Sequence, residues 1–373
     1  MKKTPHILFG ISGIGYGHTF RQLPLVEHFA ACGRVTIFAH GQSEEFYRKQ
    51  FRHRASVHVE RIEIPFLTGS KTGLDFWKAA KEPINQSSTY LRTNLMAMKR
   101  AEEFIGKPNL VITDYEPLSA QYAYLYQSPL VTIDQQSKYL IGQFPKILHG
   151  LSYQDEVARL HMFFPYAAKR IACSFFHVTR SPQAVDDVEI FPSIIKQKVR
   201  ELARSKSLNP SLLVYISAAR KFIQSQKETV QALQSIKKTD LHLFVQASEV
   251  TFFRQQRQSN WHIHPHGDKQ FLPLLARCHG MIATAGHSLL SECMYLGIPV
   301  YAIAIAPYEQ HMNAAVIQKG GFGISAPGLT KHALKNFEKH LPTFEQNIRH
   351  DKTILLRGSG QDTIIPILEG MIT

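Results

Sequence analysis

The stretch HGMIATAGHSLLSECMYLGIPVYAIAIAPYEQHMNA, residues 279–314, decides the fold of this chain. Short apolar runs at 280–284 and 300–303 alternate with longer amphipathic runs that begin after Gly286 and Tyr308. This alternation is typical of βαβ units in a parallel sheet. Gly286 stands where the first strand turns into a helix, and the backbone N–H groups at such a helix start suit a diphosphate.

The same alternation continues along the rest of the chain. Strands are predicted at 6–10, 35–39, 57–61, 110–113, 130–133, 171–178, 212–216, 241–245, 261–264, 280–284 and 300–303. Helices are predicted between them, notably at 19–31 and 74–104, and over most of the chain after 331. The texture changes around 180–210, where prolines gather and aromatic residues become rare. The pattern therefore predicts an α/β protein with two tandem, Rossmann-like, doubly wound domains at 1–180 and 181–373. They face each other across a cleft, and the last helix can pack back on the first domain.

Composition limits the classes of function. The chain has 373 residues, 44% of them hydrophobic, and 43 basic against 29 acidic side chains, for a net charge of +14. The charge is spread along the chain, which suits anionic partners without the concentrated footprint of a nucleic-acid binder. Four distant cysteines (Cys32, Cys173, Cys278 and Cys293) fit no zinc or redox spacing and favour a reducing compartment. The N-terminus begins like a signal peptide, but glycines interrupt its apolar run, so we interpret it as a first strand in a cytoplasmic protein.

A glycine-rich loop follows the first strand and contains Gly13, Gly15 and Gly17, with His18 next to it at the start of a helix. Glycines allow a tight turn and close approach of a ligand. The spacing GxGxG and the missing acid after the second strand argue against a dinucleotide site. A helix start disfavours the imidazolium form, so His18 is a candidate general base. The alternative is a histidine that merely caps the helix or packs the loop.

Two acidic residues follow the strand at 110–113. In the usual strand order this strand lies next to the first one, which brings Asp114 and Glu116 toward His18. A carboxylate bonded to one ring nitrogen would fix the tautomer of His18 and leave the other nitrogen free to accept a proton. Asp114 and Glu116 compete for this role. Capping of the next helix is the alternative for either one.

Polar residues also converge in the second half of the chain. Glu292 lies one helical turn after Gly286, His287 and Ser288, and could reach a sugar diol beside their diphosphate. Another helix opens with Glu309 and Gln310 at the end of the next strand. The plainer interpretation is an ordinary βαβ unit with incidental polar side chains.

These motifs resemble the donor site of GT-B glycosyltransferases, and they are similar to the UDP-sugar families 1 and 28, including MurG. The loop that ends in Gly17 and His18 resembles the MurG-type glycine-rich loop. The resemblance implies an inverting transfer without an essential metal. It implies the following roles: diphosphate binding by 286–288, ribose binding by Glu292, and donor-sugar binding by Glu309 and Gln310.

The resemblance extends to three further positions and to one departure. Ser217 and Arg220 follow the first strand of the second domain, where the family contacts the donor's phosphates, and a surface arginine is the plainer alternative. His264 falls in the loop beside the nucleobase. Plant members of family 1 have His, Trp and Asn where this chain has Thr284, His287 and Ser288. We therefore expect His287 and the backbone to support the phosphates.

Two other features suggest different partners. His262, His264 and His266 alternate along one strand, so a metal site is conceivable, but no acidic or cysteine ligand accompanies them. We expect no metal and no cofactor. Basic runs at 48–54 and 162–170, the second rich in aromatic residues, could contact an anionic membrane, although such runs are usually solvated helix faces.

The sequence thus predicts a metal-independent hexosyltransferase. Its donor is a nucleotide-diphosphate sugar, most simply a UDP-sugar, and its acceptor is a hydroxyl of a glycan or a lipid-linked molecule of the cell envelope. Contact with the inner face of a membrane is left open, and nucleic acid is not expected as a partner. The alternatives are a nucleotide-sugar hydrolase on the same scaffold and a non-catalytic basic protein that binds phosphorylated glycans or anionic lipid.

Overall fold

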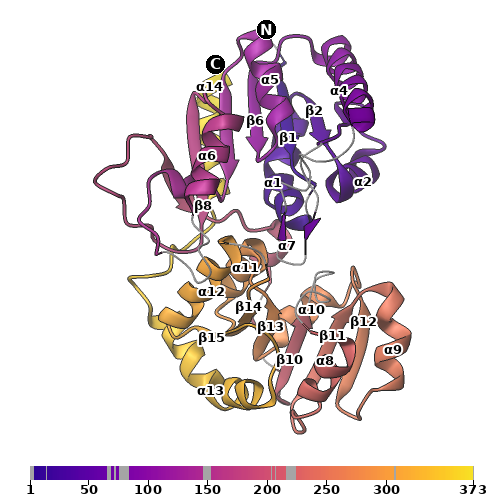
Figure 1. Ribbon diagram of the computed structural model, residues 1–373, viewed down its shortest axis with the longest axis vertical. Helices are drawn as coiled ribbons and strands as arrows, with labels where there is room; N and C mark the ends of the chain where they lie inside the picture. The colour runs from indigo at the N-terminus through magenta and orange to yellow at the C-terminus, as the bar shows by residue number, and fades with distance from the viewer. Residues whose placement is uncertain are drawn as a thin grey trace.

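The computed structural model describes residues 4–13, 15–64, 69–70, 73–74, 84–145, 153–202, 204–205, 207–215, 224–305 and 308–372. Two parallel sheets form separate bodies, seen at the top and bottom of Figure 1. The prediction of two doubly wound α/β sheets is confirmed.

The first sheet has the order β3-β2-β1-β6-β7-β8-β9, and all its pairings are parallel. Its strands are β1 (His6–Ile11), β2 (Arg34–Ala39), β3 (Val57–Arg61), β6 (Leu110–Asp114), β7 (Leu130–Asp134), β8 (Lys169–Ser174) and β9 (Glu189–Pro192). The strand order reverses between β1 and β6, so the carboxyl ends of these two strands open a crevice.

The second sheet has the order β12-β11-β10-β13-β14-β15. Its strands are β10 (Ser211–Tyr215), β11 (Asp240–Val245), β12 (Trp261–Pro265), β13 (Gly280–Thr284), β14 (Val300–Ile303) and β15 (Gly323–Ala326). Here the reversal lies between β10 and β13. The central strands are apolar and buried along their whole length, as expected for a parallel sheet that is covered on both faces.

Helices cover both faces of each sheet. On the first sheet these are α1 (Tyr16–Cys32), α2 (Gly41–Phe51), α4 (Ile84–Ile105), α5 (Pro117–Tyr126), the short η1 (Ser137–Leu140) and α6 (Gln154–Phe163). The second sheet is covered by α8 (Gln226–Leu233), η4 (Ala247–Glu249), α9 (Val250–Gln255), α10 (Phe271–Arg277), α11 (His287–Leu296), α12 (Glu309–Lys319) and α13 (Lys331–His350). A two-stranded hairpin, β4 (Gly69–Ser70) with β5 (Gly73–Leu74), lies outside both sheets.

The chain passes between the two bodies twice. After β9 it runs through α7 (Gln197–Arg200) to the second sheet, and it returns after α13. The C-terminal helix α14 (Gln361–Ile372) then lies beside the first sheet, where Figure 1 shows it in yellow. Ile364 and Leu368 of α14 are buried in the same apolar core as Leu25 and Val26 of α1.

The structure corrects several predicted boundaries. The helix predicted at 74–104 begins at Ile84, and Leu74 belongs to the hairpin. The strand predicted at 171–178 ends at Ser174, whose hydroxyl donates a hydrogen bond to the carbonyl of Phe176 and turns the chain. The short strands β9 and β15 were not predicted, because they lie at the edges of the sheets and lack the continuous buried apolar run that marks the equally short β14.

Candidate active site

His18 and Asp114 meet at the reversal point of the first sheet. Ile11 and Asp114 are paired residues at the carboxyl ends of β1 and β6, and His18 lies in the first turn of α1. The Nδ1 atom of His18 is 2.8 Å from Oδ1 of Asp114. The Asp114 side chain is completely buried, whereas the His18 side chain keeps 13% exposure. The histidine therefore lies between a buried carboxylate and the solvent at the carboxyl end of the sheet.

Arg21 and Gln22 also bind Asp114, and neither was predicted from the sequence. Arg21 donates from Nε to Oδ2 at 2.9 Å and from Nη2 to Oδ1 at 2.7 Å, and Gln22 Nε2 donates to Oδ2 at 3.0 Å. The sequence does contain a pattern that could have indicated them. His18, Arg21 and Gln22 stand at i, i+3 and i+4, on one face of a helix. Burial raises the pKa of Asp114, but the charges of Arg21 and His18 outweigh it and lower the pKa to about 2.

The ionised carboxylate assigns the tautomer of His18. Asp114 can only accept, so the proton of a neutral His18 ring belongs on Nδ1, and Nε2 keeps its lone pair. Nη2 of Arg21, which can only donate, is 2.9 Å from the same Nδ1, but it also donates to Oδ1 of Asp114 at 2.7 Å, so we assign the Nδ1 proton to the contact with the carboxylate. The arrangement can therefore accept a proton at Nε2 from a group bound at the end of the sheet.

Glu116, the competing acid, has different neighbours. It is the N-cap of α5, and its carboxylate accepts hydrogen bonds from the backbone N–H groups of Leu118 at 2.6 Å and Ser119 at 2.8 Å. Burial raises the pKa of Glu116 to about 7. The two N–H groups favour the ionised form and oppose this shift, but they do not cancel it. Of the two acids, the structure brings Asp114 to His18 and uses Glu116 to start a helix.

The Glu116→Gln variant separates these roles. Loss of a charged N-cap is expected to lower the free energy of unfolding by about 1 kcal/mol. We expect the turnover number to stay near that of the wild type, because the contacts between His18 and Asp114 are unchanged. Denaturant unfolding and steady-state kinetics measure the two effects. A fall in turnover as large as that of a His18 variant would instead make Glu116 the partner of the base.

The glycine loop brings the two domains into contact. The backbone N–H of Gly13 donates to Nε2 of His40 at 2.9 Å, and a Cβ atom at Gly13 would lie 1.7 Å from the carbonyl oxygen of His40. Gly15 has a φ of 70°, which favours glycine. The carbonyl of Gly17 accepts a hydrogen bond from Oγ of Ser288 at 3.2 Å. The start of α11 in the second domain therefore abuts the loop that carries His18.

The residues predicted to hold a diphosphate surround the start of α11. Gly286 is its N-cap, and an added Cβ would meet no atom within 4 Å there. The His287 ring is buried and packs against Phe175, with 5.5 Å between the ring centroids. Burial lowers the pKa of His287 well below its ordinary value, and the charges of Lys138, Arg21 and His18 add to this. His287 is therefore uncharged, and any phosphate here would depend on backbone N–H groups and on other cations.

Glu292 lies one turn further along α11 and carries an ion pair. Its Oε1 atom is 2.8 Å from Nζ of Lys196, a residue of the segment that connects the two sheets. The side chain of Glu292 is only 6% exposed. Tyr215, at the end of β10, feels the charge of Glu292, which adds to burial in raising the pKa of the tyrosine.

Glu309 and Gln310 open α12, as predicted. Oε1 of Gln310 accepts a hydrogen bond from the backbone N–H of Ile305 at 3.0 Å, which fixes the end of the loop after β14. The preceding residue, Tyr308, has a φ of 50°, and its hydroxyl donates to the carbonyl of Pro145 in the first domain at 2.9 Å. The structure therefore also holds this helix start against the first domain.

Lys138 is a second cation that the sequence analysis did not single out. It is completely buried in η1, and its Nζ donates to the carbonyl and Oε1 atoms of Gln135 at 2.5 and 2.6 Å. Burial lowers the pKa of Lys138 to about 8, although the charges of Glu309 and Asp134 oppose the shift. Lys138 thus belongs to the first domain, and the charge of Glu309 on the second domain affects its pKa.

The remaining predicted positions lie apart from this centre or outside the described residues. His264 is on β12, where its ring stacks on Phe244 with 4.8 Å between centroids, and its Nδ1 is 3.6 Å from Asp268. Within the described ranges, no group of three or more His, Cys, Asp or Glu side chains could hold a metal ion. Ser217 and Arg220 lie outside the described residues.

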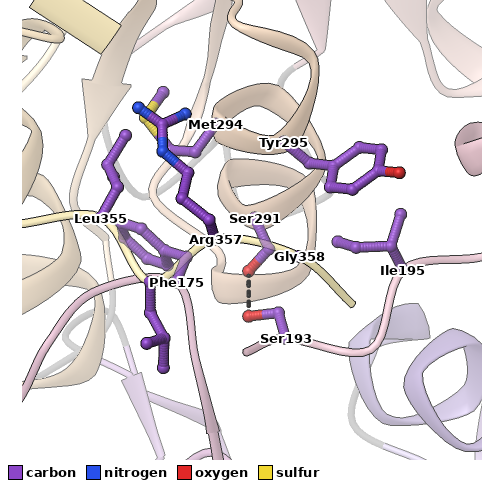
Figure 2. Close-up of a pocket in the computed structure, with 10 residues that line it drawn as sticks. Phe175, Ser193, Ile195, Ser291, Met294, Tyr295, Leu355, Arg357 and Gly358 are labelled. Carbon is purple, nitrogen blue, oxygen red and sulfur yellow. Dashed lines mark hydrogen bonds between the residues drawn. The ribbon is translucent and has the colours of Figure 1, made fainter. Parts of the chain in front are cut away.

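A small pocket lies behind α11, where the two connections between the sheets run side by side. Figure 2 shows Ser291 and Tyr295 of α11 on one wall and Ser193, Leu355 and Gly358 of the connections on the others. The hydroxyl of Ser291 donates to that of Ser193 at 2.8 Å. The volume of the pocket is about 120 Å³, whereas typical ligand sites have 300 Å³ or more. The pocket is therefore too small for a nucleotide sugar.

The chain thus has two doubly wound α/β domains, and a histidine–carboxylate pair of the first domain lies at a loop that touches a helix start of the second. Comparison with known proteins then identifies the family. The model of glycosyl transferase family 1 matches residues 5–342, and the chain belongs to this family. It is therefore a glycosyltransferase. A search of curated proteins found no match.

Solved structures of glycosyltransferases share the fold over nearly the whole chain. A UDP-glucosyltransferase from Polygonum tinctorium has 12% identity and a TM-score of 0.67, covering 99% of this chain and 98% of the other. Phytolacca americana UGT2, complexed with UDP-2-fluoro-glucose and pterostilbene, has 12% identity and a TM-score of 0.66, covering 99% and 100%. The calicheamicin glycosyltransferase CalG4 has 14% identity and a TM-score of 0.62, covering 99% and 98%. The GT-B fold is thereby confirmed.

Proposed function

We propose that this glycosyltransferase moves a sugar from a UDP-sugar to a hydroxyl group, with inversion at the anomeric carbon and without a metal ion. The observation that carries the proposal is the 2.8 Å contact between His18 and Asp114, at a loop that touches the start of α11 through Gly17 and Ser288. A proton acceptor and a helix start that favours anions thus lie on opposite sides of one junction.

The proposed chemistry is a single displacement. Nε2 of His18 takes the proton of the acceptor hydroxyl while the hydroxyl oxygen bonds to the anomeric carbon. The bond from this carbon to the diphosphate oxygen breaks, and its electron pair leaves with UDP. Backbone N–H groups of His287 and Ser288 stabilise the departing charge, whereas that of Gly286 donates to the carbonyl of Thr284. Asp114 stabilises the imidazolium that forms. Attack opposite to the leaving group inverts the anomeric configuration.

For the acceptor we propose a glycan or a lipid-linked hydroxyl. Met162 and Tyr166 are exposed large apolar side chains on the first domain and support a peripheral membrane contact. The neighbouring cations support it less, because Lys169 pairs with Glu189 and Arg170 is buried. In the part of the chain that the structure describes, no helix is long and apolar enough to cross a membrane.

The decisive experiment combines a panel of nucleotide sugars with sugar and lipid-linked acceptors, and follows nucleoside diphosphate release and product configuration by NMR. Acceptor-dependent release of UDP, an inverted product and full activity in EDTA are expected. Release of free sugar without any acceptor would favour a hydrolase. A requirement for a divalent cation would contradict the metal-free mechanism, and failure to bind any nucleotide sugar would favour a non-catalytic glycan- or lipid-binding protein.

The Glu292→Ala variant tests the donor site. If the carboxylate accepts hydrogen bonds from the ribose diol, its loss costs about 2–3 kcal/mol of binding free energy. This corresponds to a dissociation constant for UDP that is roughly 30–150-fold higher. Calorimetric titration with UDP measures the effect. Glu345→Ala is a suitable control, since Glu345 pairs with Arg349 within α13 of the same domain. An unchanged affinity would remove Glu292 from the site.

A further inference from the structure

The ammonium group of Lys196 lies where three parts of the molecule meet. It precedes α7 in the connection between the two sheets, directly after the buried residue Ile195. Its Nζ atom is 2.8 Å from Oε1 of Glu292 on α11 and 4.4 Å from the ring centroid of Phe20 on α1. Its side chain is 24% exposed. The backbone is thus anchored by its buried neighbour, while the charged end remains accessible to solvent.

The charged end lies beside Glu292, about one helical turn from Ser288 at the start of α11. Glu292 is four residues after Ser288, which corresponds to about 6 Å along a helix axis. The ribose diol and the first phosphate of a nucleotide are separated by a similar distance, of the order of one sugar ring. An ammonium group beside Glu292 can therefore reach a phosphate at the helix start by rotating the last bonds of the lysine side chain.

A leaving diphosphate needs positive charge, and the other nearby cations are committed elsewhere. Arg21 directs Nε and Nη2 at Asp114. Lys138 is fully buried and bonded to Gln135. His287 is neutral because of its burial. Among the described cations around α11, Lys196 combines partial exposure with a single exchangeable ion-pair partner.

We infer that Lys196 is a donor-binding residue that exchanges partners when the nucleotide binds. In the free protein its ammonium group pairs with Glu292. In the complex the ribose hydroxyls donate to Glu292, and the ammonium group turns to the phosphate groups. The inference rests on the proposed function. It adds to that function a phosphate ligand from the connection between the domains, a position at which neither the motifs nor the family resemblance suggested one.

Paired titrations of UDP and uridine test this inference, because the two ligands differ only in the phosphates. For Lys196→Gln we expect a dissociation constant for UDP about 10–100-fold higher than in the wild type, with a weaker dependence on salt. Uridine should bind as well as before, or better, since Glu292 no longer has a competing partner. Lys196→Arg should restore much of the affinity for UDP.

Arg200→Gln is the matched control. Arg200 lies on the same connection, at the end of α7, but pairs with Asp362 of α14. Its loss should change neither titration. Equal effects of Lys196→Gln on UDP and uridine, or no effect on either, would overturn the inference and leave the proposed function intact. If the wild type binds neither ligand, the proposed function fails as well, which is a distinguishable result.

Discussion

The turnover number of the His18→Ala variant is expected to fall by about 10²–10⁴-fold, the usual contribution of a general base. The affinity for UDP should remain unchanged, because the predicted donor contacts lie on the second domain. In the proposed mechanism His18 offers Nε2 to the acceptor, because Asp114 binds Nδ1 at 2.8 Å. Steady-state kinetics with the true acceptor and calorimetry with UDP measure the two quantities independently.

His28→Ala is a matched control for this variant. His28 lies on the same helix, but it is half-buried and pairs with Glu369 of α14. Its replacement should leave turnover unchanged. If His18→Ala keeps near-normal turnover, the acceptor is activated by another group, and the proposed mechanism is wrong.

The second large effect concerns stability. Asp114→Asn leaves the buried guanidinium of Arg21 without its counter-ion, and breaking a buried pair in this way typically costs 3–5 kcal/mol of folding free energy. Turnover should fall less than in His18→Ala, because the base is retained although its tautomer is no longer held by a carboxylate. Chemical denaturation gives the change in unfolding free energy. Asp362→Asn, which removes an exposed pair with Arg200, should cost about 1 kcal/mol at most.

The pH dependence of this effect has a definite sign. The pKa of Asp114 is lowered from its ordinary 3.8 to about 2 in the folded protein, so its ionisation stabilises the fold above pH 4. That contribution is lost as the pH falls from about 4 through 2, and amounts to about 2 kcal/mol. The stability difference between the wild type and Asp114→Asn should shrink accordingly between pH 6 and pH 2. A constant difference would show that the pKa of Asp114 is the same in the folded and the unfolded protein.

Much of the architecture follows from local patterns. Short apolar runs separated by amphipathic ones are typical of parallel strands that are buried on both faces, so most strand positions and the two doubly wound sheets were predictable. The same reasoning brought His18 near the acids after β6, because parallel strands end on one edge. The glycine loop and the start of α11 were recognisable because each follows a predicted strand directly.

What the sequence by itself determined is the fold class, the order of the longer strands and helices, and the strand ends at which polar residues gather. Tertiary structure alone decided which of these residues touch. It assigned Asp114 to His18 and Glu116 to the cap of α5, although the two acids are only two residues apart at the end of the same strand. It also brought Lys196 to Glu292, across 96 residues of chain. Periodicity encodes which face of an element is buried, whereas a contact between side chains depends on how separate elements dock, and that is set by the packing of the whole core.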